Sequence, residues 1–278
     1  EELRGGGGAG RLEVFGSWTY NMWVVGSDID VNVRTPERIG RFFPRLKAAV
    51  AARDPQATVE VVQAQVPLAR VCVQGLHIDV THEPGDENYV AAHHVQVREW
   101  ARRWQGDEVV CCCMRIVKLW ATSRDVHSPR NHTLNSMGYM LMLLAVAAAP
   151  PPAAACAGEG GLDPVSDLLT RFFATYAASL KQGVPRTVVH APHAEVHPPP
   201  SREADVYRLS QHARDPDGSG SGTAMFVQDP FLEDINVARF VNARSLRRLW
   251  AAFSDALGIM QAGGEDAYQQ LVRRKKIR

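Results

Sequence analysis

The chain has 278 residues, with 31 Lys and Arg against 30 Asp and Glu, so its formal net charge at pH 7 is +1. This balance excludes a protein whose whole surface is cationic and wraps nucleic acid, although it is compatible with a local basic groove. At roughly 100–200 residues per domain, we expect one large domain or two smaller ones. No apolar run reaches the ~20 residues of a membrane-spanning helix, so we expect no membrane partner. No signal peptide is visible, and a targeting segment removed before residue 1 is left open.

The cysteines lack the spacing of a metal site, whereas three histidines in one later stretch have metal-like spacing. Three of the five cysteines, at 111–113, are consecutive, and no CxxC pair occurs. This usage is typical of buried thiols in a reducing compartment. His190, His193 and His197 lie in a proline-rich stretch that offers no fourth ligand and little rigidity. We therefore expect no zinc site.

The first hundred residues predict a sheet with helices. Five stretches have the composition or the polar–apolar alternation of strands. They are 12–15, 27–33, 59–62, 67–73 and 77–81. Apolar residues at helical spacing follow Pro36, whose fixed φ suits the start of a helix. A second helix is expected at 90–104.

The remainder of the chain predicts helices. The helical stretches are 109–123, 135–149, 168–180, 246–260 and 267–272. The stretch 135–149 is apolar nearly all round, so we expect it to be buried. Residues 182–222 are rich in Pro, Gly and Ser, and we interpret them as an insertion or mobile loop outside the core. The expected fold class is α+β, with a mixed-sheet domain at 11–104 and a mainly helical domain at 105–278.

The carboxylates at positions 28 and 30 carry the clearest chemical signal. Gly16 and Ser17 are followed, after nine residues, by Ser27, Asp28 and, two positions further on, Asp30. On a strand, residues i and i+2 point the same way, about 6.5–7 Å apart, so the two carboxylates can serve one site. Adjacent carboxylates repel unless a cation neutralises them. Their hard oxygens suit Mg²⁺.

Asp79, on the predicted strand at 77–81, supplies a third carboxylate if that strand pairs alongside the strand at 27–33. Three carboxylates can hold two metal ions about 3.5–4 Å apart, the arrangement for in-line phosphoryl displacement. Gly16 allows a phosphate to approach the backbone closely, and the hydroxyls of Ser17 and Ser27 can donate to it. The sequence therefore predicts a phosphoryl-transfer site. The alternative is an Asp-x-Asp pair on a solvated strand edge.

Eight segments follow one another in chain order over residues 14–260. They are Phe15-Gly16-Ser17, Ser27-Asp28-Ile29-Asp30, Val66 to Val71, His77-Ile78-Asp79-Val80, Arg115 to Ala121, Thr133 to Tyr139, Gln228-Asp229-Pro230-Phe231 and Asn236 to Arg239. Together they resemble the motifs of the polymerase-β-type nucleotidyltransferases, and among these the terminal uridylyltransferases and poly(A) polymerases. The chain is most similar to the mitochondrial uridylyltransferases of RNA-editing complexes. The resemblance implies a polymerase-β-type catalytic domain followed by a mainly helical domain, with a cleft between them.

The implied activity is transfer of UMP from UTP to the 3′ end of single-stranded RNA, with Mg²⁺ or Mn²⁺ as the cofactor. Asp28 and Asp30 would hold both metal ions, while Asp79 would bind the catalytic ion and help to deprotonate the 3′-hydroxyl. The resemblance also implies an RNA-editing or RNA-processing complex as the protein partner. The implied location is the mitochondrion, with the cytoplasm as the alternative.

The same resemblance implies a set of nucleotide-binding residues. They are Gly16, Ser17, Ser27, His93, Lys118, Ser136, Met137 and Asp229. Lys118 would neutralise the β- and γ-phosphates as a point charge, and Ser136 would hydrogen-bond the triphosphate. Asp229 would read the uracil N3–H, directly or through a water. The residues alone leave other roles open: a solvated helix lysine, a serine that bonds to its own helix, and an Asp that forms a turn before Pro.

Four positions depart from the family pattern, and they leave the choice of base open. They are Thr122 for a second lysine, Met137 for a base-stacking tyrosine, Leu232 for an acidic residue, and His93 or His94 near a ribose-binding asparagine. Arg124 or Lys181 would have to compensate for the missing lysine. Met137 is either a weak platform for the base or a core residue. The alternatives to a uridylyltransferase are a poly(A) polymerase that uses ATP and an inactive scaffold of an RNA-processing complex.

Overall fold

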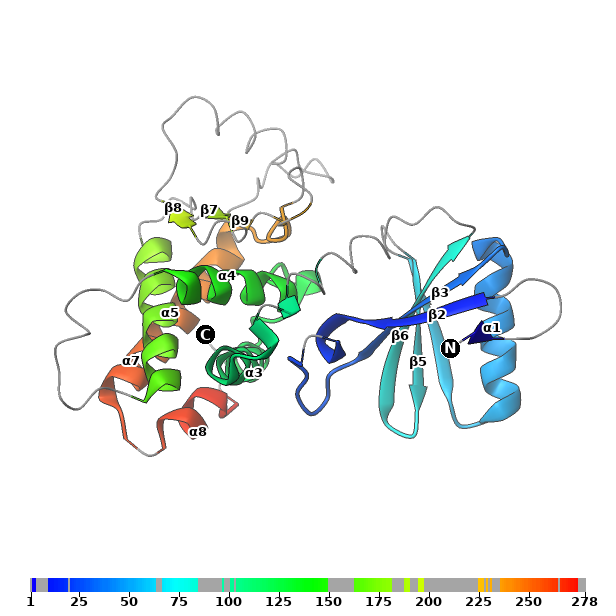
Figure 1. Cartoon of the computed structure of the whole chain (residues 1–278), viewed down its shortest axis with the longest axis horizontal. Helices are drawn as coiled ribbons and strands as arrows, with labels where there is room; N and C mark the ends of the chain where they lie inside the picture. Colours follow the sequence, from blue (N-terminus) through cyan, green and yellow to red (C-terminus); the bar gives the residue numbers. More distant parts are fainter. Residues whose placement is uncertain are drawn as a thin grey trace, which may run out of the picture. The chain divides into compact units, whose positions relative to one another are not determined.

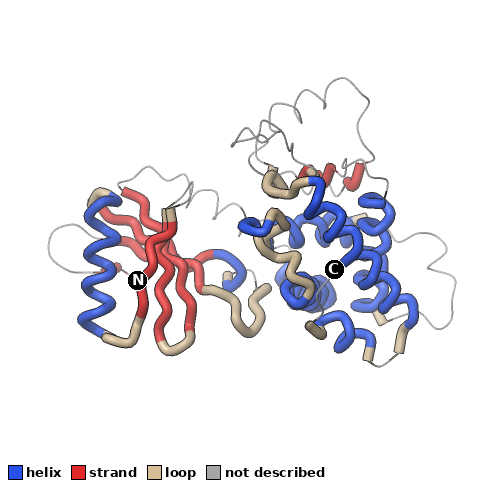
Figure 2. Tube along the Cα trace, turned by 180° about the vertical axis from the view of Figure 1, so that it is seen from behind, coloured by secondary structure: helices blue, strands red, loops and turns tan. Residues whose placement is uncertain are grey.

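The computed structural model divides the chain into two compact units, Glu1–Gly106 and Asp107–Arg278, called the first and second units below (Figure 1). The residues that the structure describes are 2–3, 10–19, 21–63, 67–84, 97, 101–102, 104–149, 163–181, 188–190, 195–197, 225–227, 229, 231, 236–264 and 266–274. Strands dominate the first unit and helices the second (Figure 2).

The first unit contains one six-stranded sheet with the strand order β1-β2-β3-β6-β5-β4. The strands are β1 (Glu2–Leu3), β2 (Gly10–Phe15), β3 (Ile29–Thr35), β4 (Thr58–Val62), β5 (Leu68–Val73) and β6 (Leu76–Pro84). Only the central pair, β3 with β6, is parallel. A parallel pair needs a crossover between its strands, and helix α1 (Ile39–Arg53) lies within it.

Helix α1 covers one face of this sheet. Phe42 and Phe43 pack against Ala69 and Val71 of β5 and Val80 of β6. Because side chains alternate along a strand, the residues next to these point to the opposite face. That opposite face carries the polar residues of the predicted site, and the apolar core under α1 keeps the strands that bear them in place.

The second unit is built from helices and one small sheet. The helices are α3 (Glu108–Ser123), α4 (Ser136–Ala148), α5 (Pro164–Lys181), α7 (Ala243–Ala262) and α8 (Ala267–Val272), and the single turn η2 covers Pro129–Asn131. The sheet has the order β8-β7-β9, with β7 (Val188–His190), β8 (Glu195–His197) and β9 (Phe226–Val227). Residues Gly138 to Val146 of α4 are all buried, which confirms the expectation from its composition.

An aromatic cluster forms the core of the second unit. The fully buried ring of Trp120 on α3 meets Phe173 of α5 and Phe253 of α7, each at a centroid distance of 4.9 Å, and Tyr139 of α4 at 5.9 Å. All three contacts are edge-to-face, an arrangement that aromatic quadrupoles favour. One side chain thus joins four helices into a single core.

Most of the predicted elements are present, with shifted ends. Helix α7 begins at Ala243, three residues before its predicted start, because the Asn242 side chain and Ser245 form a capping box there. The interpretation of 182–222 as a loop was wrong in part, since β7 and β8 lie within it. The helix predicted at 90–104 lies largely outside the described residues. Among the described helices, none is long and apolar enough to cross a membrane.

Candidate active site

The parallel pairing of β3 with β6 places two of the predicted carboxylates side by side. Asp30 is the register partner of Asp79, and both precede a residue of the α1-facing row, so they project from the opposite face. This confirms the strand pairing on which the third carboxylate depended. Asp28 lies one residue before β3, which begins at Ile29, so it is not within the strand as predicted.

A tight turn at the end of β2 lies against one of these carboxylates. The turn η1 (Gly16–Trp18) contacts β3, and Gly16 has a φ of 71°. A Cβ at this position would overlap Oδ2 of Asp30 and lie 2.8 Å from its Cγ. Glycine is therefore required here twice over, for its positive φ and for the space that the Asp30 carboxylate occupies.

Hydrogen bonds close the loop between η1 and Asp28. The backbone N–H of Met22 donates to the carbonyl of Ser17 at 3.0 Å. The Ser27 hydroxyl accepts from the Val24 N–H at 2.9 Å, and the Ser27 N–H donates to the Val24 carbonyl at 2.9 Å. Ser17 and Ser27 are half-buried. They lie at the two ends of a loop whose shape is fixed by its own backbone.

Arg70 of β5 pairs with the third carboxylate. It is the register partner of Asp79. Its Nε donates to Oδ1 at 2.9 Å and its Nη2 donates to Oδ2 at 2.8 Å. These hydrogen bonds raise the pKa of the Arg70 guanidinium above its usual value, and the negative charge of Asp28 adds to this effect. The sequence indicated Arg70 only as a member of a family-like segment and assigned it no role.

The oxygen donors of Asp28, Asp30 and Asp79 suit a cation chemically, although the three side chains do not form one metal-binding group. Both oxygens of Asp79 are bonded to Arg70. Within the part of the chain that the structure describes, no three His, Cys, Asp or Glu side chains form a group suited to a metal ion. The guanidinium supplies positive charge to Asp79 and lies within electrostatic range of Asp28. The donors are carboxylate oxygens, which suit Mg²⁺ or Mn²⁺.

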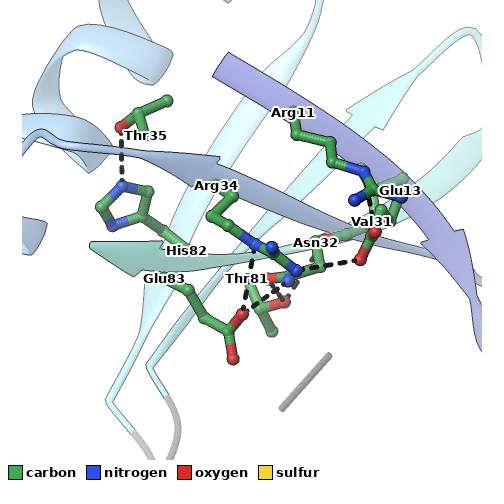
Figure 3. Close-up of polar contacts among 9 residues, drawn as sticks. All are labelled: Arg11, Glu13, Val31, Asn32, Arg34, Thr35, Thr81, His82 and Glu83. Carbon is green, nitrogen blue, oxygen red and sulfur yellow. Dashed lines mark hydrogen bonds and ion pairs between the residues drawn. The ribbon is translucent and has the colours of Figure 1, made fainter. Parts of the chain in front are cut away.

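A buried chain of polar contacts supports β3 and β6 next to the carboxylates (Figure 3). The Thr81 hydroxyl donates to the Asn32 Oδ1 at 3.0 Å, and the Asn32 Nδ2 donates to Glu83 at 3.0 Å. Arg34 lies 4.0 Å from Glu83 and 3.5 Å from Glu13 of β2. Asn32 and Thr81 stand two residues beyond Asp30 and Asp79, on the same face of the sheet. These contacts fix the register that aligns the two carboxylates.

On the α1-facing side, His82 joins the end of β6 to that of β3. Its Nε2 lies 2.9 Å from the Thr35 hydroxyl (Figure 3). Its ring also stacks on that of Phe42, with centroids 4.0 Å apart. Burial lowers the pKa of His82. The lowered pKa favours the uncharged ring at neutral pH, and the contacts with Thr35 and Phe42 give the histidine a structural role.

In the second unit, the first turn of α4 carries Ser136, which the sequence predicts to bind the triphosphate. Ser136 is its first residue, and the Asn135 side chain caps the helix by accepting from the Gly138 N–H at 2.8 Å. The Nε2 of His127 lies 2.8 Å from the Ser136 hydroxyl. Burial, and then the positive charge of Lys118, lower the pKa of His127 to about 4. Lys118, Ser136 and His127 are therefore neighbours.

His127 is a second residue that sequence reasoning missed. It lies in the loop between α3 and η2, where no periodicity marks it. Only the fold brings it to Ser136. Because a neutral imidazole can donate through one nitrogen, the tautomer that carries the proton on Nε2 leaves the Ser136 hydroxyl proton available to another acceptor.

The predicted base-reading residue is buried in a turn. Asp229 is 3% exposed, and its Oδ1 accepts from the Phe231 N–H at 2.9 Å. This is the turn-forming role that the residues alone left open. Asn236 nearby accepts from the N–H groups of Val227 and Ala238 and donates to the carbonyl of Met225. It therefore organises the segment that carries Asp229.

The remaining residues that the sequence singled out either lie on described helices or fall outside the described residues. Met137 is half-buried in the first turn of α4, a helix that contacts β9. His93, His94, Leu232, His193 and Cys156 lie outside the described residues. Cys111 and Cys113 are buried on α3, and burial raises the pKa of both thiols. Buried thiols of this kind are packing residues and are unreactive.

Comparisons with known proteins establish the fold. No protein-family model matches the chain, and no curated protein matches it. Among solved structures, a cytoplasmic RNA terminal U-transferase superposes with a TM-score of 0.70 at 18% identity, over 96% of this chain and 87% of that one. The Cid1 poly(U) polymerase does so with a TM-score of 0.66 at 18% identity, over 96% and 86%. Cid1 in complex with the UTP analog UMPNPP gives a TM-score of 0.65 over the same shares at 18% identity. The chain thus has the α+β fold of these solved structures.

Proposed function

We propose that the chain is an RNA terminal uridylyltransferase that transfers UMP from UTP to RNA 3′ ends and releases pyrophosphate. The observation that carries the proposal is the register pairing of Asp30 with Asp79 beside the turn at Gly16. The fold similarity to a terminal U-transferase and to the Cid1 poly(U) polymerase supports it.

The chemistry follows from the carboxylates and the loop. The RNA 3′-oxygen attacks the α-phosphorus, and the bond between that phosphorus and the oxygen that bridges to the β-phosphate breaks, so that pyrophosphate leaves. The proton of the 3′-hydroxyl passes to a carboxylate oxygen of Asp79. Asp28, Asp30 and Asp79 would hold Mg²⁺, which when bound stabilises the charge on the attacking and leaving oxygens. Structures of Cid1 with Mg nucleotides support this choice of metal. Gly16 leaves open the space that the Asp30 carboxylate occupies.

Residues of the second unit bind the triphosphate in this proposal. Lys118 neutralises the β- and γ-phosphates, while Ser136 donates its hydroxyl proton to a phosphate oxygen. The lowered pKa of His127 keeps that ring neutral, so it adds no charge there and leaves the cationic role to Lys118. Asp229 accepts the uracil N3–H, which adenine lacks.

The finer assignments rest on the sequence resemblance alone. They are membership of the mitochondrial, editing-complex type of uridylyltransferase, an RNA-editing or RNA-processing complex as the partner, and Mn²⁺ as an alternative metal. Subcellular fractionation and affinity purification of the endogenous protein test the first two, and primer extension with each metal tests the third.

Primer extension on a single-stranded RNA, with each of the four nucleoside triphosphates and with Mg²⁺ or Mn²⁺, tests the proposal. We expect UTP to be used best and Asp30→Asn and Asp79→Asn to abolish addition. Glu60→Gln is the matched control, because Glu60 pairs in register with Arg70 on the other side from Asp79. Preferred use of ATP would indicate a poly(A) polymerase. No addition with any triphosphate would indicate a scaffold.

A further inference from the structure

Two tryptophans on the loop between β2 and β3 form an exposed stacked pair. The rings of Trp18 and Trp23 have centroids 5.0 Å apart and an interplanar angle of 4°. The two residues remain 40% and 41% exposed. Each ring covers one face of the other, so the accessible surface lies on the outer faces and edges. Val25, beyond the pair, is 93% exposed.

The loop holds this pair in a preformed arrangement. Met22, between the two tryptophans, is only 4% exposed and anchors the loop to the first unit. The Thr19 carbonyl accepts from the Gln105 side chain at 2.7 Å, and Asn21 has a φ of 56° that turns the chain back. A platform that is already ordered loses little conformational entropy when a ligand binds.

Both ends of the loop lie next to the predicted catalytic carboxylates. Trp18 is two residues from Gly16, which lies against Asp30, and two residues of chain span at most about 7 Å. Trp23 is five residues before Asp28. The pair therefore flanks the place where the acceptor strand of the proposed reaction must present its 3′-hydroxyl.

We propose that Trp18 and Trp23 form a stacking platform for a base at the 3′ end of the single-stranded RNA acceptor. The proposal rests on the function proposed above. Parallel, exposed indole rings fit planar bases, and such stacking is tolerant of sequence because every base has a π-face. The loop's sequence has no Lys or Arg between Gly16 and Asp28, so the platform binds through the bases and not through the phosphates.

Steady-state kinetics with separate substrate titrations test the platform. Trp18→Ala and Trp23→Ala should raise the KM for oligo(U) RNA about 5- to 150-fold, the range expected for one lost base stack. The KM for UTP should change less than twofold. Trp18→Phe, which keeps an aromatic face, should recover much of the loss. Trp250→Ala is the matched control, because Trp250 on α7 is 38% exposed and lies outside this loop.

Direct binding separates this proposal from the catalytic one. Two stacked indoles give an exciton couplet in circular dichroism, which oligo(U) should alter in the wild type in the absence of any triphosphate. RNA with abasic 3′-terminal positions should leave it unaltered. Because no phosphate contact is involved, Trp23→Ala should weaken RNA binding without changing its salt dependence.

The outcomes are distinct. A changed couplet in a protein that adds no nucleotide would support the platform and overturn the proposed catalysis. Normal UTP addition with an unchanged KM for RNA in both alanine variants would overturn the platform alone. An equal rise in the KM for UTP would show that the pair only shapes the Gly16 loop. A change in oligomeric state in place of RNA affinity would show that the pair binds protein, and would also overturn the proposal.

Discussion

Arg70 and Asp79 face each other on neighbouring antiparallel strands and form two parallel hydrogen bonds, at 2.9 and 2.8 Å. A guanidinium in this geometry uses both oxygens of the carboxylate. The fork occupies one lone pair on each oxygen and leaves the others free. Arg70 therefore competes with a cation for one edge of the Asp79 carboxylate.

Lysine and methionine at position 70 test this competition. Because exposed or partly exposed ion pairs contribute ~0.5–1 kcal/mol, we expect Arg70→Lys to tighten Mn²⁺ binding about two- to fivefold. Arg70→Met, which also removes a positive charge, should tighten it further. The measurement is Mn²⁺ titration followed by electron paramagnetic resonance. In an Asp79→Asn background, Arg70→Lys should have no effect. Weaker binding by Arg70→Lys would instead mean that Arg70 orients Asp79 for the metal.

Substitution of Gly16 tests its role beside Asp30, and Gly75 provides a matched control with the same kind of backbone conformation. Gly16→Ala should lower Mn²⁺ affinity and nucleotide addition at least tenfold, because its Cβ would overlap the Asp30 carboxylate. Gly75→Ala, in the turn between β5 and β6, introduces the same left-handed strain (φ 82°) with no atom within 4 Å of the new Cβ. Gly75→Ala should lose ~1–2 kcal/mol of stability, the cost of a left-handed non-glycine residue, and Gly16→Ala should lose at least as much because the Asp30 carboxylate must also shift. Equal activity in the two variants would remove the role assigned to Gly16.

The strands of the candidate site could be predicted because their alternation is local. The polar–apolar alternation around Asp30 and Asp79 identified both strands, and the side on which each carboxylate lies followed from it. The alternation left the pairing of the two strands conditional. Strands β4 and β5 lie between them in sequence, and only the crossover topology brings β6 beside β3.

The residues that sequence reasoning missed act through tertiary contacts. Arg70 stands on a strand whose register with β6 no local pattern encodes. His127 lies in a loop and reaches Ser136 through the turn η2. The loop interpretation of 182–222 was wrong for β7 and β8 because each strand has three residues, too few for a visible period of two.

The neutral state of His127 predicts how stability varies with pH. Its pKa is about 4 in the folded protein and about 6.5 when unfolded. Between these values the unfolded chain binds the proton and the folded chain does not, so stability is complete above pH 6.5 and falls as the pH drops towards 4. The loss is at most about 3 kcal/mol.

Urea unfolding at several pH values measures this effect. His127→Asn keeps an amide donor for Ser136 and should flatten the profile between pH 4 and 6.5. His82, whose pKa burial also lowers, contributes a remaining slope of the same sign. The His82→Asn variant separates the two contributions. A profile that His127→Asn leaves unchanged would mean that the pKa of His127 is the same in the folded and the unfolded chain.

The last prediction concerns the choice of base, and the buried turn at Asp229 decides which variant can test it. Because Oδ1 accepts from the Phe231 N–H, Asp229→Ala would remove the turn together with any base contact. Asp229→Asn keeps an oxygen for that N–H and removes the charge. A charge-assisted hydrogen bond contributes ~1.5–3 kcal/mol, so Asp229→Asn should lower kcat/KM for UTP about 10- to 150-fold. The kcat/KM for ATP should stay level or rise, since adenine presents an acceptor at N1.

Asn236→Ala is the control: Asn236 binds three backbone groups of the same segment, so its loss should lower kcat/KM for both nucleotides and the melting temperature together. An equal fall for UTP and ATP in Asp229→Asn, with an unchanged melting temperature, would assign Asp229 to the shape of the segment and leave uracil recognition to other residues.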